Sequence, residues 1–413
     1  MSSLKTNIFY SSILTTANYI FPLITYPYVS RVLGVSNIGA CNFVDSIINY
    51  FLMLSTLGIG IVGIREIAKN KEDKTNLQKI FSQLFTINTI STTIAIVAVL
   101  IAMHTVPKLQ ENYELMWIGV LKLVFNYLLI EWFFKGIEDF KYVTNRTILV
   151  RCLYVLSVFV FVRTTNDVSI YYFLTSATIV VNAIINLIYA RRLIKFKFCF
   201  SSLKEPAKSV FTFGVYNILT SLYTTFNVAY LGFISSAAQV GYYTTATKIH
   251  TLILMAYTAV TGVMMPRMTS ILSKNKYEDY KRLIKKSIIV LFVFAVPCVI
   301  LLEIFAPLII NIIAGPGYQE AILPLRIIAP LVLIIGIEQI LITQSLMPMG
   351  KDKAVLVNSI IGALVGVMMN VILVPYFASV GSAIVWLLSE IVVMLSAIYY
   401  YSKELHIIKN MTK

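Results

Sequence analysis

The chain has 413 residues, of which 58% are hydrophobic and only 13% are charged, and its formal net charge is +15. Soluble domains are about half apolar and about a quarter charged, so this composition excludes a soluble protein. The apolar residues form continuous runs instead of alternating with polar ones, which excludes the strands of a membrane barrel. We therefore predict an all-α polytopic membrane protein.

Twelve apolar segments are long enough to cross the hydrocarbon core as helices, since a crossing needs about 20 residues. In chain order they span approximately residues 7–32, 38–64, 80–105, 114–135, 142–163, 168–190, 208–234, 239–265, 284–306, 322–347, 354–376 and 379–402. A polar stretch after the sixth segment divides them into two six-helix lobes. The lobes cover residues 1–193 and 208–402, joined by a cytoplasmic linker over 194–207 and followed by a cytoplasmic tail over 403–413.

Basic residues predict the orientation of the chain, because Lys and Arg next to short loops stay on the cytoplasmic side. Most of the 34 basic residues fall in loops on the side that holds both ends of the chain. We therefore predict cytoplasmic N- and C-termini. Membrane insertion alone explains the excess of positive charge, and no basic-aromatic recognition motif accompanies it. We expect no nucleic-acid partner.

The loops offer no visible place for catalysis or metal binding. The sequence has no phosphate loop of the G-x-x-x-x-G-K-[ST] type, its 3 histidines are scattered, and its 4 cysteines have no paired spacing. We expect no enzyme, no cofactor and no metal site. A transporter is the class that remains.

An aspartate, Asp45, interrupts the apolar stretch IGACNFVDSIINYFLML. A charge at the centre of a helix in the bilayer costs at least about 2.5 to 3.5 kcal/mol, so Asp45 is expected to face the protein interior or a water-filled cavity. Asn42 and Asn49 fall on the same helical face. We therefore predict that this helix lines a cavity.

The second lobe resembles the first in sequence. One shift along the chain aligns Gly39 with Gly241 and Gly60 with Gly262. The same shift aligns the polar face around Asp45 with a threonine-rich face that carries Lys248. Parallel repeats of this kind are typical of transporters with two lobes around a cavity, and we expect both polar faces to line it.

Other charges in the predicted helices are candidates for function or for structural ion pairs. We select Asp45 and Glu338 as candidates for coupling transport to a proton or a sodium ion. The alternative for each charge is a buried ion pair that holds helices in register. The remaining charges are Lys122, Glu131, Lys248 and Glu390, with Arg31, Glu303 and Arg326 nearer the outer surface.

The first predicted helix contains Pro22 and Pro27, each of which removes a backbone hydrogen bond and prevents a straight helix. A bent helix that lines a cavity can act as a gate. Tyrosines in the first and seventh helices carry hydroxyl groups that suit sugar contact, although tyrosine is more often a packing residue. The predicted cavity or sugar contacts are Asn18, Tyr26, Asn42, Asn49, Tyr216, Tyr223, Thr244 and Thr251.

Four stretches carry a family resemblance: RVLGVSNIGACNF (31–43), STLGIGIVGIREIAKNK (55–71), GPGYQEAILPLRII (315–328) and PMGKDKAVLVNS (348–359). In these four stretches the chain resembles the bacterial polysaccharide flippases of the Wzx family. That family belongs to the multidrug/oligosaccharidyl-lipid/polysaccharide (MOP) superfamily. The resemblance implies a MATE/MOP-like fold, with two six-helix lobes around a central cavity that opens alternately to each side.

The resemblance also implies a function. Such a flippase moves a polyprenyl-diphosphate-linked oligosaccharide from the cytoplasmic to the outer leaflet of the bacterial inner membrane, driven by an ion gradient. The implied partners are this lipid-linked oligosaccharide, a proton or sodium ion, the lipid bilayer and polysaccharide assembly proteins. Cationic side chains would bind the diphosphate through charge-assisted hydrogen bonds. The candidates are Arg31, Lys122, Lys248 and Arg326.

Two alternatives remain open at this point. A MATE-type multidrug or cation antiporter has the same predicted fold, and the intramembrane charges include both acids and bases. A membrane glycosyltransferase or polysaccharide polymerase is of another class, and the short outer loops argue against it because catalytic residues of such enzymes are expected in longer loops.

Overall fold

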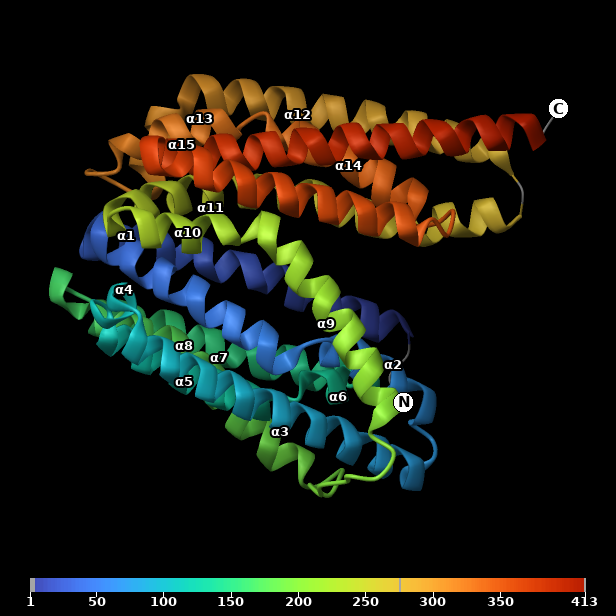
Figure 1. Cartoon of the computed structure of the whole chain (residues 1–413), viewed down its shortest axis with the longest axis horizontal. Helices are drawn as coiled ribbons and strands as arrows, with labels where there is room; N and C mark the ends of the chain where they lie inside the picture. The colour runs from blue at the N-terminus through green and yellow to red at the C-terminus, as the bar shows by residue number, and fades with distance from the viewer. Residues whose placement is uncertain (1–3, 275, 412–413) are drawn as a thin grey trace. The chain divides into compact units, whose positions relative to one another are not determined.

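The computed structural model describes residues 4–274 and 276–411, although some side chains in this range, such as those of Tyr216 and Tyr223, lie outside the described part. Within these residues all regular elements are helices (Figure 1). The chain divides into two compact units, Met1–Ile218 and Leu219–Lys413. The all-α fold confirms the fold class predicted from composition.

Unit 1 contains the helices that correspond to the first six predicted segments. Its elements are α1 (Leu4–Thr56), α2 (Ile59–Asn70), α3 (Lys74–Thr105), α4 (Pro107–Gln110), α5 (Tyr113–Asn126), η1 (Tyr127–Leu129), α6 (Glu131–Gly136), α7 (Phe140–Phe161), η2 (Thr165–Asp167) and α8 (Val168–Ala190). The next helix, α9 (Lys204–Thr224), begins in unit 1 and crosses the unit boundary.

Unit 2 contains the remaining helices. They are α10 (Phe226–Ile234), α11 (Ala237–Ser273), α12 (Tyr277–Ile313), η3 (Gln319–Ala321), α13 (Ile322–Ile328), α14 (Leu331–Leu341), η4 (Ile342–Leu346) and α15 (Asp352–Met411). The element η4 is a π-helix that continues directly from α14.

In the described part of the chain, 8 helical segments are long and apolar enough to cross a membrane. Two of them each contain two predicted segments: Phe9–Asn70 is interrupted at Gly34, and Asp352–Glu404 is interrupted at Ala378. The chain is therefore a multi-pass membrane protein. The total of twelve crossings and the cytoplasmic position of both termini stay predictions.

The interruption of α1 depends on a glycine. Gly34 has φ 78° and ψ 168°, a backbone conformation that residues with a Cβ rarely adopt. It lies in the gap between the first two predicted segments. Pro22 and Pro27, in contrast, lie within helical backbone. The interruption of α1 therefore lies at Gly34, and the bend expected at the prolines stays a prediction.

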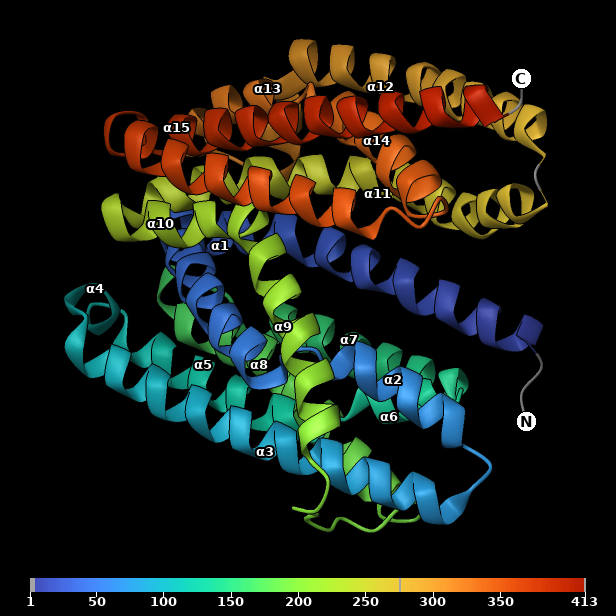
Figure 2. The ribbon, with the colours of Figure 1, turned by 45° about the vertical axis from the view of Figure 1, so that its right-hand side comes forward.

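Helix α2 packs on α3 and α6 in unit 1 (Figure 2). Aromatic side chains fill the core between these helices. The ring of Phe81 stacks on Phe85 and on Trp132, with 5.7 and 5.4 Å between ring centroids. Gly63 allows α2 to approach, because a Cβ at this position would lie 2.7 Å from the Trp132 ring. Since each aromatic pair stabilises by about 0.5–1.5 kcal/mol beyond the burial of its area, this cluster fixes one end of the bundle.

The start of α9 is fixed to the short break between α1 and α2. The backbone N–H of Gly58 donates a hydrogen bond to Val210 O at 3.0 Å. A Cβ on Gly58 would lie 2.5 Å from the same oxygen. On the α9 side, a Cβ on Gly214 would lie 2.9 Å from the Leu57 side chain. The chain that leaves unit 1 is therefore held by close backbone contact.

Replacing Gly58 with Ala should destabilise unit 1, because the backbone oxygen of Val210 cannot rotate away as a side chain can. We expect a loss of about 1–3 kcal/mol, typical of overpacking. The measurement is thermal stability of detergent-solubilised protein, read as the monodisperse fraction that survives heating. Gly60→Ala is the matched control, since a Cβ there meets no described atom within 4 Å, and it should not lower stability. Equal losses in both variants would contradict this packing of α9.

Candidate functional site

An ion pair joins three helices inside unit 1. Lys122 Nζ of α5 lies 2.6 Å from Asp45 Oδ1 of α1. The hydroxyl of Tyr172, in α8, donates to the same oxygen at 3.3 Å, and Asn49 Nδ2 donates to Asp45 Oδ2 at 3.3 Å. Both oxygens of one carboxylate are therefore satisfied by donors from α1, α5 and α8.

This pair lies deep in the predicted span. Asp45 follows the interruption at Gly34 by eleven residues, which corresponds to about 17 Å of helix, or roughly halfway across a hydrocarbon core of about 30 Å. The Lys122 side chain is 14% exposed and the Asp45 side chain 38%. Asp45 is thus the more accessible partner, and its carboxylate neutralises a lysine that is almost buried.

The close approach of α5 to α1 depends on Gly119, which lies one turn before Lys122. A Cβ at this position would overlap with the Ile48 side chain, which is fully buried and has little room to move. The same Cβ would lie 3.4 Å from the Tyr172 hydroxyl. Gly119 therefore allows Lys122 to reach Asp45.

A second charged network lies near the start of α7 and is centred on Arg146. The Arg146 side chain is 2% exposed, and its Nη2 lies 2.7 Å from Glu131 Oε1 of α6. Its Nη1 donates to Asn186 Oδ1 of α8, and Asn186 Nδ2 donates to Leu129 O. The planar guanidinium has donors on two sides, so one arginine connects α6, α7 and α8.

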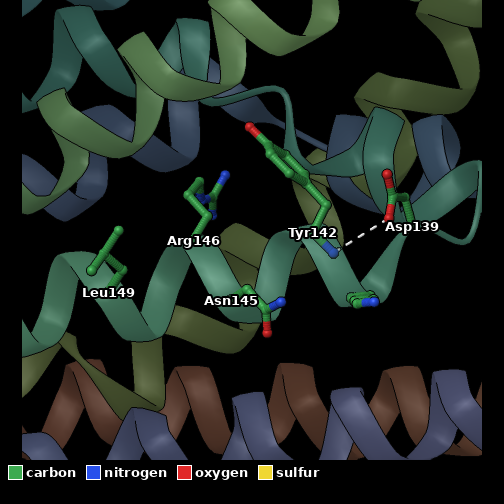
Figure 3. A pocket seen from close by; sticks show the side chains of 6 residues that line it. Asp139, Tyr142, Asn145, Arg146 and Leu149 are labelled. Atoms are coloured by element: carbon green, nitrogen blue, oxygen red, sulfur yellow. Dashed lines mark hydrogen bonds between the residues drawn. The ribbon is translucent and has the colours of Figure 1, made fainter.

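Tyr142 and Asp139 extend this network around the start of α7. The Tyr142 hydroxyl donates to Asn186 Oδ1 at 3.0 Å, and its ring stacks on Tyr189 with 4.1 Å between centroids. Asp139 Oδ1 accepts from Tyr142 N at 3.3 Å and Oδ2 accepts from the Tyr189 hydroxyl at 3.0 Å. Figure 3 shows Tyr142 and Arg146 on the same side of α7, beside an open pocket. The lining residues are Asp139, Lys141, Tyr142, Asn145, Arg146 and Leu149.

In unit 2, the candidate Glu338 is a buried residue of α14. The acid Glu390 of α15 lies close to it, so that the two carboxyl groups interact. Trp386 Nε1 donates to Glu390 Oε1 at 3.0 Å. The structure thus brings together two acids that lie on separate predicted helices.

Two of the predicted diphosphate ligands contact backbone carbonyl groups. Arg326 Nε donates to Glu303 O of α12 at 3.0 Å, and Arg31 Nη1 donates to Pro27 O of its own helix at 2.5 Å. Lys248 is half-buried on α11. The assignment of these residues to diphosphate binding stays a prediction.

The predicted sugar contacts differ in exposure. Tyr26 and Thr244 are buried, Asn42 and Asn49 are half-buried, and Asn18 and Thr251 are exposed. The side chains of Tyr216 and Tyr223 lie outside the described residues. Contact of these residues with sugar stays a prediction.

Sequence patterns do not single out Arg146, Asn186 or Tyr172. Arg146 falls among the basic residues that the charge pattern assigns to an inner connection, but α7 begins at Phe140 and carries Arg146 into the bundle. The four-residue spacing of Tyr142 and Arg146, which places them on one helical face, is the signal that could have identified this network.

Replacing Asp45 with Ala should destabilise the protein because Lys122 loses its carboxylate partner. Breaking a buried pair costs about 3–5 kcal/mol. Since Asp45 is 38% exposed, we expect a smaller loss of about 2 kcal/mol. The double variant Asp45→Ala/Lys122→Met removes both charges and should recover most of the thermal stability. If Asp45→Ala is as stable as the unmodified protein, this ion pair does not hold the helices together.

Replacing Arg146 with Lys should also lower thermal stability, because an ammonium group cannot reach Glu131 and Asn186 together. A hydrogen bond to a charged group contributes about 1.5–3 kcal/mol, so we expect a loss in this range. Arg151→Lys is the control on the same helix, where Arg151 Nη1 donates to Ala17 O at 3.2 Å, a contact that a lysine can replace. A loss for Arg151→Lys as large as that for Arg146→Lys would argue against a special role of the guanidinium fork.

Similar proteins are found over nearly the whole chain. A protein of Escherichia coli (strain K12) with the name "Putative O-antigen transporter" is 28% identical over 394 residues, which cover 95% of this chain and 95% of that protein. Two solved structures share the fold. An inward-facing multidrug resistance MATE family transporter of the MOP superfamily has a TM-score of 0.74 at 14% identity, covering 95% of this chain and 96% of that chain.

The second structure is the lipid II flippase MurJ in an inward closed conformation. It has a TM-score of 0.73 at 15% identity, covering 95% of this chain and 87% of that chain. The family described as "Polysaccharide biosynthesis protein" matches residues 4–272, which is more than half of the chain. The chain therefore belongs to the polysaccharide biosynthesis protein family.

Proposed function

We propose that this protein is a flippase that moves a polyprenyl-diphosphate-linked oligosaccharide from the cytoplasmic to the outer leaflet of the bacterial inner membrane by alternating access. The observation that carries the proposal is family membership, together with similarity over 95% of the chain to a protein named for O-antigen transport. The lipid-linked oligosaccharide is its proposed partner, and polysaccharide assembly proteins are further proposed partners.

The charged head of this substrate is the physical problem of transport. A diphosphate cannot enter hydrocarbon without a cationic partner, because an unpaired charge there is strongly unfavourable. Lys122 offers such a cation at mid-depth in unit 1, where Asp45 holds it at 2.6 Å. In the proposed mechanism the diphosphate replaces Asp45 as the partner of Lys122. Asp45 then neutralises the lysine again after release, so that neither state leaves Lys122 unpaired.

Three further cations are proposed to bind the diphosphate at other stages of transport: Arg31, Lys248 and Arg326. We propose that the polar residues predicted to contact sugar act with them, and that a proton or sodium gradient drives the cycle through Asp45 and Glu338. A cation that already donates to a backbone carbonyl, as Arg326 does to Glu303 O, retains other donors for a phosphate oxygen.

A multidrug antiporter is the second candidate, since one of the similar structures is such a transporter. At 14% identity this similarity supports a shared fold and not a shared substrate. The pairing of Lys122 with Asp45 favours an anionic substrate, because a cationic drug would compete with Lys122 for the carboxylate and leave the lysine unpaired.

The experiment uses a bacterial strain that assembles a lipid-linked repeat unit and lacks its own flippase. Expression of this chain should restore polysaccharide at the cell surface, measured by antibody or lectin labelling. Lys122→Ala should lower the labelling about tenfold or more, as expected for losing one charge-assisted contact. Lys108→Ala is the control, because Lys108 lies on an exposed turn and pairs with Glu111.

Membrane levels of each variant are measured beside the labelling, so that a loss of protein is not mistaken for a loss of transport. Ethidium efflux is followed in the same cells. Efflux without surface polysaccharide would contradict the flippase proposal and support the antiporter.

A further inference from the structure

The interior of unit 2 contains two acids that lie against one another. Glu338 of α14 and Glu390 of α15 are 7% and 5% exposed, and their carboxyl groups lie close enough to interact with each other. Neither acid takes part in an ion pair with any of the described side chains. Two ionised carboxylates at this distance would repel each other strongly in a medium of low dielectric constant.

The hydrogen bonds around this pair are incomplete. Trp386 Nε1 donates to Glu390 Oε1 at 3.0 Å, but Glu338 Oε1 is buried and finds no donor among the described residues. The His250 ring packs edge-on against Trp386, with 5.1 Å between centroids. His250 is 0% exposed, and neither of its ring nitrogens finds a partner in the same part of the chain. The cluster therefore has more hydrogen-bond acceptors than donors, whereas buried polar groups are normally satisfied.

We propose that Glu338 and Glu390 bind one exchangeable proton between their carboxyl groups, and that Trp386 and His250 position this pair. A proton turns one carboxyl group into a donor to the other, which joins the two acids by a hydrogen bond and removes their repulsion.

A proton fits this site better than a sodium ion. Hard cations prefer about six or more oxygen ligands, whereas one oxygen of the pair already accepts the Trp386 N–H. In the described residues there is no group of three or more His, Cys, Asp or Glu side chains that could hold a metal ion. The rings of Trp386 and His250 supply no oxygen ligand.

Other titratable groups of unit 2 lie near the pair or are engaged elsewhere. Tyr243 of α11 is close enough to Glu390 to interact with its charge, and its hydroxyl accepts a hydrogen bond from Asn227 Nδ2 at 3.2 Å. Lys248 precedes His250 by two positions, so it points to a different side of α11. Arg326 of α13 donates a hydrogen bond to the backbone carbonyl of Glu303 in α12.

The position of the pair suits a switch. Four residues after Glu338, α14 changes to the π-helix η4, and single π-helical turns are frequent at functional sites. Release of the proton would leave two carboxylates in contact, which favours a different packing of α14 against α15. The role of this switch in driving transport rests on the proposed flippase function, whereas proton binding itself does not.

The experiment is infrared spectroscopy of the purified full-length protein in lipid nanodiscs, without substrate, during a pH titration. We expect the carbonyl stretch of a protonated, buried carboxyl group that disappears on alkalinisation and corresponds to one proton per chain. Glu338→Gln and Glu390→Gln should each abolish this titrating band. Glu278→Gln is the control, since Glu278 is an exposed acid that pairs with Lys281, and it should keep the band.

Trp386→Phe provides a second test that does not remove an acid. It keeps the ring against His250 and removes the N–H donor, so the frequency of the band should change while the band persists. Persistence of the unchanged band in both glutamine variants would overturn the proposal. Loss of the band from the unmodified protein when sodium is added at constant pH would overturn it in favour of a cation site.

A separate assay of surface polysaccharide distinguishes this proposal from the proposed function. A titrating band in a protein that moves no lipid-linked sugar would contradict the flippase and leave the proton site in place. Full transport by a glutamine variant that lacks the band, with unchanged dependence on the proton gradient, would contradict the coupling role.

Discussion

A charge inside the hydrocarbon core must be neutralised within the protein, and both units are organised around this constraint. Asp45 lies about 17 Å of helix beyond the interruption at Gly34. In unit 2, Glu390 follows the interruption at Ala378 by twelve residues, or about 18 Å. Each unit therefore carries an acid at mid-depth, on a helix that begins at a break in the backbone.

The two units neutralise their acids by different chemistry. In unit 1, Asp45 pairs with Lys122 and accepts further donors from its own and neighbouring helices. An opposite charge of this kind can be exchanged for another anion. In unit 2, Glu338 meets Glu390, a like charge, and a proton is the simplest group that makes the contact favourable. Both proposed sites thus follow from the need to neutralise an acid inside the membrane. A lysine as the partner suits an anionic substrate, and a second acid as the partner suits a coupling proton.

Hydropathy predicted most of the fold because length and apolar content decide whether a helix can cross a membrane. The gap around Gly34 was also predictable from the sequence, since a polar interval with a glycine separates two apolar runs. The partners of the charged residues could not be predicted from the sequence. Asp45 and Lys122 are separated by 77 positions, and their contact depends on Gly119, whose missing side chain gives no signal in the sequence.

The sequence repeat directed attention to Lys248, because it aligns the polar face around Asp45 with the threonine-rich face that carries this lysine. Packing within unit 1 instead supplies Lys122. Arg146 was missed for a related reason: a basic residue near the end of an apolar segment looks like part of a loop until the start of the helix is known. In both cases the helices were predictable, and the contacts between helices were not.

The most direct measurement is leaflet exchange in liposomes that contain the purified protein and a fluorescent polyprenyl-diphosphate sugar. An impermeant quencher added outside removes the fluorescence of every probe molecule that can reach the outer leaflet. The proposed function predicts that the protected fraction falls to near zero with the unmodified protein and is retained with Lys122→Ala. Equal loss of protection with both proteins, or complete protection with the unmodified protein, would contradict it.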